Sequence, residues 1–259
     1  MKLNISRFEV QNKKQFNKNI YEESDTLYKI CNDYNNYETQ DILTYIYSMP
    51  KIKGILGIND LLCENGFVYG YTMPKLRDSV SLKNIIENQF TIEEKYHLIK
   101  NLTDTLKQLH NYLVIGDIRL DNILIYNNEP IFIDLENGQK IYERNYLITL
   151  YDLRDKPYSV IDDLFKLFIY IISIMYNRDF EYLFEFDITK RKVFDNFISK
   201  IPSNEIQTYY EYLKESLIED NIHPIYFTDV FQNFNEDTIK NIVEKPLSLK
   251  LFWFKKLTT

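Results

Sequence analysis

The stretch from Ile115 to Glu136, IGDIRLDNILIYNNEPIFIDLE, constrains the fold of this chain more than any other. It contains two short runs rich in β-branched residues, Asn122–Tyr126 and Ile131–Ile133, joined by a turn at Asn127–Pro130. Strand-forming runs on either side of a turn-forming sequence are typical of a β-hairpin. The sequence therefore predicts an antiparallel pair of strands here.

Polar side chains stand where the arms of this hairpin begin and end. Asp117 and Asn122 come just before the first arm, and Asp134 directly follows the second. Because a hairpin brings these positions together, we expect a cluster of one amide and two carboxylates. Such oxygens can bind Mg²⁺, and a further carboxylate can orient an attacking hydroxyl in phosphoryl transfer. The alternative is that these residues are ordinary turn and strand-end side chains in a solvated loop.

The spacing D-x-x-x-x-N, followed by a hairpin and an Asp that leaves a hydrophobic strand, resembles the catalytic loop and metal-binding turn of protein kinases. Where that family has H-R-D and D-F-G, this chain has Ile115-Gly116-Asp117 and Asp134-Leu135-Glu136. The pattern S-x-x-D-D-L-x-x-L-x-x-Y over residues 159–170 is similar to the casein kinase I and vaccinia-related kinase group. The resemblance extends over residues 26–235.

This resemblance implies roles for several side chains. Asp117 would accept or orient the proton of the attacking hydroxyl, and Asn122 and Asp134 would hold Mg²⁺. Arg119 stands where Ser/Thr kinases usually carry Lys, and its guanidinium could meet the γ-phosphate of ATP. Lys29 would contact the nucleotide phosphates.

The partner of Lys29 would be an acid on the helix of the small lobe. Glu38 is the first choice and Asp41, one turn further on, is the alternative; an exposed strand lysine is the competing interpretation of Lys29. Residues 72–80, which include Met73, would connect the lobes and offer their backbone to the adenine, unless they form an ordinary linker.

The resemblance implies an α+β, two-lobed fold with a small β-rich lobe over residues 1–75 and a mainly helical lobe over residues 76–259. In the helical lobe, Thr91–His110 has helical spacing of apolar residues and begins with a Thr91/Glu94 capping box. In the small lobe, strand character is found in Arg7–Val10, Thr26–Cys31, Gly54–Asn59 and Phe67–Tyr71, and helical spacing in Tyr37–Met49.

One departure from the kinase pattern concerns glycine. Kinases cover the phosphates with a glycine-rich loop, whereas no glycine precedes Gly54 in this chain. The candidate loop, residues 11–19, offers Asn and Lys instead, and Lys13, Lys14 or Lys18 could meet phosphate as point charges.

Composition and charge argue against several other classes of protein. The net charge of −7 and the lack of a Lys/Arg block argue against a nucleic-acid-binding protein. Two cysteines, Cys31 and Cys63, make no disulfide framework and fit a reduced, cytoplasmic setting. The apolar run Leu164–Tyr176 contains Lys166 and predicts a buried helix rather than a membrane span. The segment Leu247–Lys256 is expected to pack on the helical lobe, with a docking segment as the alternative.

The expected function is an ATP- and Mg²⁺-dependent Ser/Thr protein kinase acting on a protein substrate. The alternative is a pseudokinase that binds a protein partner and transfers nothing, motivated by the glycine-free loop, by Ile115 in place of His and by Glu136 in place of Gly. A third possibility is a small-molecule phosphotransferase of the aminoglycoside or choline kinase type. Those enzymes also carry G-D at the catalytic loop.

Overall fold

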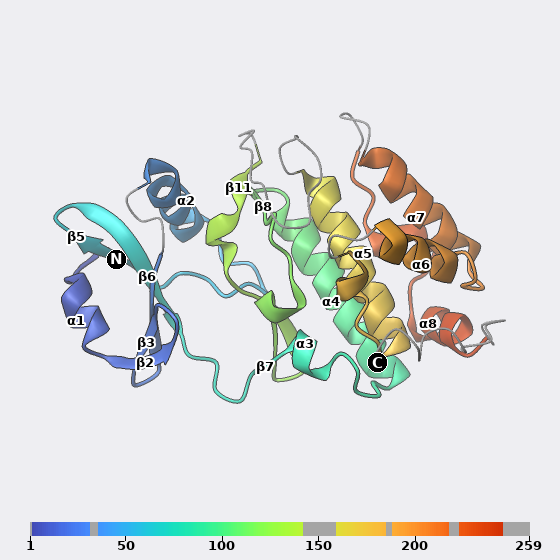
Figure 1. The fold of residues 1–259 in the computed structure, drawn as a ribbon, viewed down its shortest axis with the longest axis horizontal. Coiled ribbons are helices and arrows are strands. Elements are labelled where there is room, and N and C mark those ends of the chain that lie inside the picture. Colours follow the sequence, from blue (N-terminus) through green and yellow to red (C-terminus); the bar gives the residue numbers. More distant parts are fainter. Residues whose placement is uncertain (1, 32–35, 142–158, 185–187, 218–222, 246–259) are drawn as a thin grey trace. The chain divides into compact units, whose positions relative to one another are not determined.

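The computed structural model describes residues 2–31, 36–141, 159–184, 188–217 and 223–245. The chain is an α+β protein with a mixed β-sheet and several helices (Figure 1). It divides into two compact units, Met1–Leu82 with Thr105–Asn145, and Lys83–Asp104 with Tyr146–Thr259. The Asp117–Asp134 stretch therefore groups with the N-terminal strands, whereas the sequence placed it in the helical lobe.

The first unit is built on a six-stranded sheet in the order β1-β5-β6-β4-β3-β2. β1 runs parallel to β5, and every other pair of neighbours in this sheet is antiparallel. The strands are β1 (Lys2–Asn4), β2 (Lys14–Asn17), β3 (Ile20–Glu23), β4 (Thr26–Ile30), β5 (Asp60–Glu64) and β6 (Phe67–Pro74).

Each face of this sheet carries its own hydrophobic cluster. On one face, Leu43 of helix α2 (Tyr37–Ser48) packs with a group of buried strand residues that includes Leu27 and Tyr71. On the other face, Val10 of helix α1 (Arg7–Gln11) is fully buried with Ile30, Leu62 and Tyr69. The predicted helix at Tyr37–Met49 is confirmed.

The segment Arg7–Val10 is helix α1, so the strand predicted there is wrong. Ser6 and Glu9 form a capping box, in which the Glu9 backbone N–H donates to Ser6 Oγ at 3.2 Å and the Ser6 backbone N–H donates to Glu9 Oε2 at 2.8 Å. These bonds satisfy amide groups that the start of a helix leaves without partners. The capping pattern therefore outweighed the alternation of apolar and polar residues.

The strand predicted at Gly54–Asn59 is also wrong. Gly54 has a positive φ of 86°, and Ile55 makes only an isolated parallel bridge to Phe132. The Phe132 N–H donates to the Gly54 carbonyl at 2.8 Å, and the Leu56 N–H donates to the Phe132 carbonyl at 2.9 Å. The segment thus braces the end of another strand, and the regular strand β5 begins at Asp60.

The predicted hairpin is confirmed, with a shorter turn. Strands β9 (Ile123–Tyr126) and β10 (Glu129–Phe132) pair in antiparallel register across Asn127 and Asn128, which both have positive φ. Two left-handed residues are what a tight two-residue hairpin turn requires, and Asn adopts that conformation readily. β7 (Val80–Ser81) completes this three-stranded sheet, and β8 (Leu113–Val114) pairs with β11 (Gln139–Lys140).

The second unit is helical in its described residues. It contains most of α3 (Leu82–Ile85) and α4 (Ile92–Leu109), with α5 (Val160–Tyr176), α6 (Ile188–Ile198), α7 (Asn204–Ser216) and α8 (Glu236–Val243). The ring of Phe168 lies within 6.4 Å, centroid to centroid, of the rings of Phe194, Tyr210 and Phe227.

Two helix predictions in this unit are confirmed. Thr91 and Glu94 cap α4 as expected, with the Thr91 N–H donating to Glu94 Oε2 at 2.8 Å. Leu164–Tyr176 belongs to the largely buried helix α5, and none of the described helices is long and apolar enough to cross a membrane. The tail Leu247–Lys256 lies outside the described residues.

Candidate functional site

Lys29 lies on β4, on the sheet face that α2 covers. In the antiparallel register with β6, its Cα is directly opposite that of Tyr71. Its side chain is 13% exposed, so a charged ammonium here needs partners.

Two carboxylates and a hydroxyl complete what we call the Lys29 cluster: Lys29, Tyr71, Asp134 and Glu136. Lys29 Nζ is 2.9 Å from Asp134 Oδ1 and also forms an ion pair with Glu136 Oε1. The Tyr71 hydroxyl donates to the other oxygen of Glu136, Oε2, at 2.9 Å. Both acids come from the segment just after β10, where Asp134 precedes the 3₁₀ turn η2 (Leu135–Asn137).

The Lys29 cluster contains one cation and two carboxylates, a net charge of −1, with Glu136 12% and Asp134 30% exposed. Burial by itself lowers the pKa of Lys29, but the charges of Glu136 and Asp134 outweigh it, so the pKa lies above the ordinary lysine value. Burial, together with these carboxylates, raises the pKa of Tyr71 well above its ordinary value. Tyr71 is therefore a neutral hydrogen-bond donor at physiological pH.

The predicted pair between Lys29 and Glu38 is replaced by these contacts. Glu38 is exposed at the start of α2, where its N–H donates to the Asn36 side chain at 3.0 Å. Asp41, the alternative, is also exposed and pairs with Lys140. The inward side of α2 is apolar, formed by Ile42, Leu43 and Ile46.

The backbone at Asp134 is positioned by its own conformation and by a hydrogen bond of the preceding residue. Its own conformation is left-handed (φ 60°, ψ 47°), which is uncommon for a residue other than glycine and costs on the order of 1 kcal/mol. The N–H of Ile133, just before it, donates to the Asn122 carbonyl at 3.0 Å. This bond joins the two arms of the hairpin next to Asp134 and Asn122, and the predicted clustering of their side chains stays a prediction.

Hydrogen bonds within the loop before the β9–β10 hairpin connect Asp117, Arg119 and Asn122. The Asn122 side-chain amide donates to the Asp117 carbonyl at 3.2 Å, and the Asn122 N–H donates to the Arg119 carbonyl at 2.9 Å. Gly116 has φ 72°, which lets the chain turn sharply into this loop. Asp117, Arg119 and Asn122 are all partly exposed.

Asn122 and Asp134 each have one side-chain oxygen that could serve as a ligand for a hard cation such as Mg²⁺. Because the Asn122 Nδ2 donates to the loop, its Oδ1 faces the other way, and within the described residues no hydrogen bond reaches it. Asp134 Oδ2 is likewise left over when Oδ1 accepts from Lys29. The described residues contain no group of three His, Cys, Asp or Glu side chains that could hold a metal. Mg²⁺ often takes only one or two protein oxygens, with phosphates and water completing its shell.

Met73 belongs to the sheet rather than to a connector. β6 extends to Pro74, and Met73 lies in register opposite Leu27 with its side chain buried in the α2-side cluster. The connector predicted over residues 72–80 is therefore shorter and begins at Lys75.

The predicted phosphate loop at residues 11–19 is mostly regular structure. It contains the end of α1, strand β2 and a two-residue turn in which Asn19 has φ 58°. The turn lies beside Lys29, since the Ile30 N–H donates to the Asn19 carbonyl at 2.9 Å. Lys13 pairs with Glu23 at 2.7 Å.

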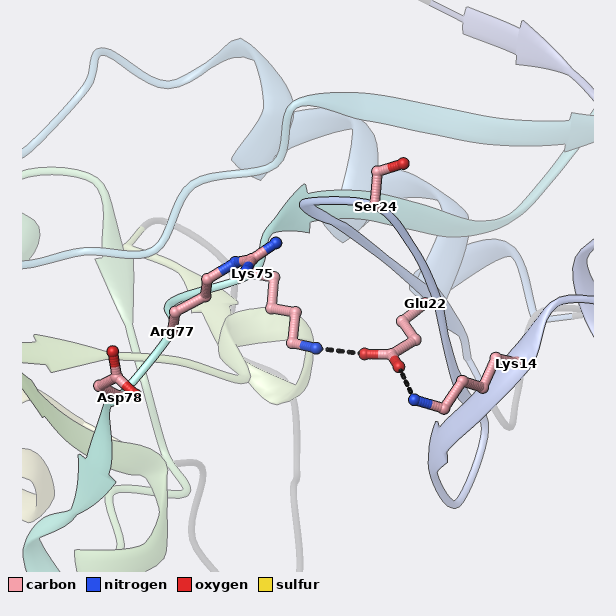
Figure 2. Close-up of a pocket in the computed structure, with 6 residues that line it drawn as sticks. All are labelled: Lys14, Glu22, Ser24, Lys75, Arg77 and Asp78. Carbon is pink, nitrogen blue, oxygen red and sulfur yellow. Dashed lines mark hydrogen bonds and ion pairs between the residues drawn. The ribbon is translucent and has the colours of Figure 1, made fainter.

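Figure 2 shows a polar pocket beside the β3–β4 turn that contains Ser24, where Glu22 lies between Lys75 and Lys14. Lys14 Nζ is 2.5 Å from Glu22 Oε1, and Lys75 pairs with Glu22 Oε2. Hydrogen bonds from Lys14 and Lys75 lower the pKa of Glu22 to about 2. Glu22 thus keeps its charge and links strands β2 and β3 to the connector that begins at Lys75.

Two members of the Lys29 cluster were missed by sequence reasoning. Glu136 was noted only as a departure from the Gly of D-F-G, and Tyr71 only as part of a strand. A partial signal existed for Glu136, because an acid two residues after Asp134 follows the same buried strand. No family model matches the sequence, and no curated protein matches it either.

Proposed function

We propose that this chain has a protein-kinase-like fold and transfers the γ-phosphoryl group of ATP, with Mg²⁺, to a Ser or Thr hydroxyl of a protein. The observation that carries the proposal is the 2.9 Å contact between Lys29 and Asp134, which are far apart in the sequence. Protein kinases likewise need a strand lysine and the Asp of the metal-binding turn in place together.

The order of the strands also supports the proposal. Lys29 is on the third strand of the antiparallel run β2-β3-β4, and a helix, α2, follows that strand. Kinases carry their phosphate-binding lysine on the third strand of the small lobe, before the helix that supplies its acid. Asn122 directly precedes β9 and Asp134 follows β10, so both flank the open end of the later hairpin, where Ile123 pairs with Phe132.

Each side chain has a distinct role in this proposal. The ammonium of Lys29 binds phosphate oxygens, and Asp117 orients the substrate hydroxyl and takes its proton. Asn122 and Asp134 would hold Mg²⁺, which, when bound, neutralises charge on the phosphates. Arg119 could add a charged hydrogen bond to the γ-phosphate.

The charge of the Lys29 cluster predicts that nucleotide binding requires the metal. Without a metal, two carboxylates and one ammonium repel a polyphosphate. We therefore expect ATP alone to leave thermal unfolding unchanged. At 100 times its dissociation constant, ATP with Mg²⁺ should add about 2.7 kcal/mol, which corresponds to roughly 5–10 °C for a chain of this size.

The Asp134→Asn variant should lose most of this thermal shift, because the proposed metal ligand loses its charge. Asp117→Asn should keep the shift but lower phosphoryl transfer by about 10²–10⁴-fold, since only the proton acceptor is removed. Asp41→Asn is the matched control, because it removes an exposed carboxylate that pairs with Lys140 and should change neither measurement. A full shift in Asp134→Asn would refute the metal-site assignment.

A second function, a binding module without catalysis, is favoured by one specific observation. The β2–β3 turn has two residues and no glycine, so its backbone offers little to cover phosphates. Absence of any thermal shift at millimolar ATP with Mg²⁺ would support this function instead. If the shift is present, transfer to a panel of basic proteins, acidic proteins, aminoglycosides and choline separates a protein kinase from a small-molecule phosphotransferase.

A further inference from the structure

We infer that Glu136, oriented by Tyr71, is the positioning residue for Lys29 and takes the place of an acid from helix α2. This inference rests on the proposed function, because it assigns Lys29 its orientation toward nucleotide phosphates. Its structural part, the link between Lys29 and Glu136, can be tested without nucleotide.

The geometry gives Glu136 two partners, one for each oxygen. Oε1 pairs with Lys29, and Oε2 accepts from the Tyr71 hydroxyl at 2.9 Å. The strand register sets this arrangement, because Lys29 and Tyr71 are directly opposite on β4 and β6 and their side chains share the α2 side of the sheet. Tyr71 is 5% exposed, so its ring has little freedom and the hydroxyl holds Glu136 in one orientation.

Helix α2 supplies no acid to this place. A small cavity beside the cluster is lined by Leu43 and Ile46 from the helix and by Tyr71 and Glu136. The two acids in the first turns of the helix are exposed. The apolar face of α2 packs against the segment that carries Glu136, so the helix supports that carboxylate instead of providing one.

This arrangement resolves a conflict within the proposed site. Lys29 contacts Asp134, yet Asp134 is also the proposed metal ligand. A lysine held by Asp134 alone would lose its partner when that carboxylate turned to a cation. Glu136 keeps Lys29 in place, and Asp134 is left available for the metal.

The first experiment is a double-mutant cycle in the absence of nucleotide, with Lys29→Met, Glu136→Gln and the double variant, followed by urea unfolding. Glu136→Gln preserves shape and the acceptor for Tyr71. We expect a coupling of at least tenfold in the unfolding equilibrium constant, because Glu136 attracts Lys29 but only repels Asp134 once the lysine is gone. The matched cycle with Glu38→Gln should show no coupling. If Lys29→Met does not fold, the same cycle is measured with Lys29→Gln, which also removes the charge but keeps a polar group beside the two carboxylates.

The second experiment measures binding of ATP with Mg²⁺ by calorimetry. Glu136→Gln should raise the dissociation constant at least tenfold, and Tyr71→Phe severalfold, because each loosens Lys29. Glu38→Gln should change it less than twofold. Where transfer is measurable, the loss should fall on KM for ATP more than on kcat, since the ammonium acts in binding phosphates.

The outcomes separate the two proposals. Coupling of Lys29 to Glu38 and not to Glu136 would overturn the inference, as would unchanged ATP affinity in Glu136→Gln when the wild type binds. Coupling to Glu136 in a wild-type chain that binds no nucleotide would overturn the proposed function and leave the Lys29–Glu136 link as a structural contact. Coupling together with the tenfold loss of affinity supports both.

Discussion

The substitution Lys29→Met tests the buried charges of the site most directly. Methionine keeps most of the length of the lysine side chain and its packing against β6, so the change removes mainly the ammonium. What remains is a pair of carboxylates, Asp134 and Glu136, with 30% and 12% of their side chains exposed and no cation between them.

The loss of stability expected for Lys29→Met follows from the distances and burial of its two ion pairs. At 2.9 Å and an effective dielectric constant of about 20, the attraction of Lys29 to Asp134 is about 6 kcal/mol, and the contact with Glu136 adds a comparable amount. The cost of removing these ions from water offsets several kcal/mol for each of them. Breaking a buried pair by removing one partner costs about 3–5 kcal/mol, and we expect the unfolding free energy to fall by that amount at pH 7.

The matched control is Lys53→Met. Lys53 Nζ is also 2.9 Å from its partner, Glu129 Oε1, but the side chains are 77% and 41% exposed. An exposed pair contributes about 0–1 kcal/mol, so the two variants differ in burial and not in contact distance.

The assay is urea unfolding followed by circular dichroism, with hydrogen exchange of the β4 and β6 amides to locate the change.

The pH dependence of the stability difference adds a second check. The pKa of Lys29 is raised in the folded chain, so its contribution is complete below the unfolded value of about 10.4 and is lost as the pH rises through the folded value. The difference between wild type and Lys29→Met should therefore be constant from pH 7 to about 9.5 and shrink only at higher pH. A cost for Lys29→Met no larger than that for Lys53→Met would refute the buried cluster.

Two further predictions concern the backbone around the site. Gly54→Ala should destabilise the chain by about 1–3 kcal/mol in urea unfolding, because φ is 86° and a Cβ would lie 2.3 Å from Thr105 Oγ1. Gly57→Ala meets nothing within 4 Å and is the matched control; equal costs for the two would contradict the strain argument. Ser6→Ala should cost about 1 kcal/mol, since it removes the hydroxyl that caps α1 with Glu9, and faster hydrogen exchange of the α1 amides is the measurement. Unchanged exchange would show that the capping box does not stabilise this helix.

Local signals were sufficient for the elements that depend on neighbouring residues. The β9–β10 hairpin followed from two β-branched runs around Asn127 and Asn128, and α4 from its Thr91/Glu94 capping box. The same kind of signal, Ser6 with Glu9, was present at the start of α1, although Arg7–Val10 was predicted to be a strand. That error was avoidable, because a capping box specifies amide partners and alternation over four residues does not.

The partner of Lys29 could be predicted only in part from the helical spacing of apolar residues in α2. The apolar positions Ile42, Leu43 and Ile46 continue at helical spacing to Thr39, so the inward face of α2 ends in a threonine and not in an acid. Periodicity therefore argued against Asp41 and gave Glu38 no clear place on that face. Helical periodicity could not identify Glu136 as the residue that pairs with Lys29.

Only the tertiary structure determined that Glu136 pairs with Lys29. The register of β4 against β6 places Lys29 opposite Tyr71, and the bracing of Phe132 by Gly54 and Leu56 directs the chain after β10 back toward that pair. Strand register and the path of a segment after a strand depend on contacts between residues distant in sequence, and a one-residue shift would turn Lys29 to the other face. The amino-acid sequence determined which charged and polar groups the site contains. Burial in the folded chain decided which of them pair, because an ammonium removed from water is stable only beside the carboxylates that the fold brings within reach.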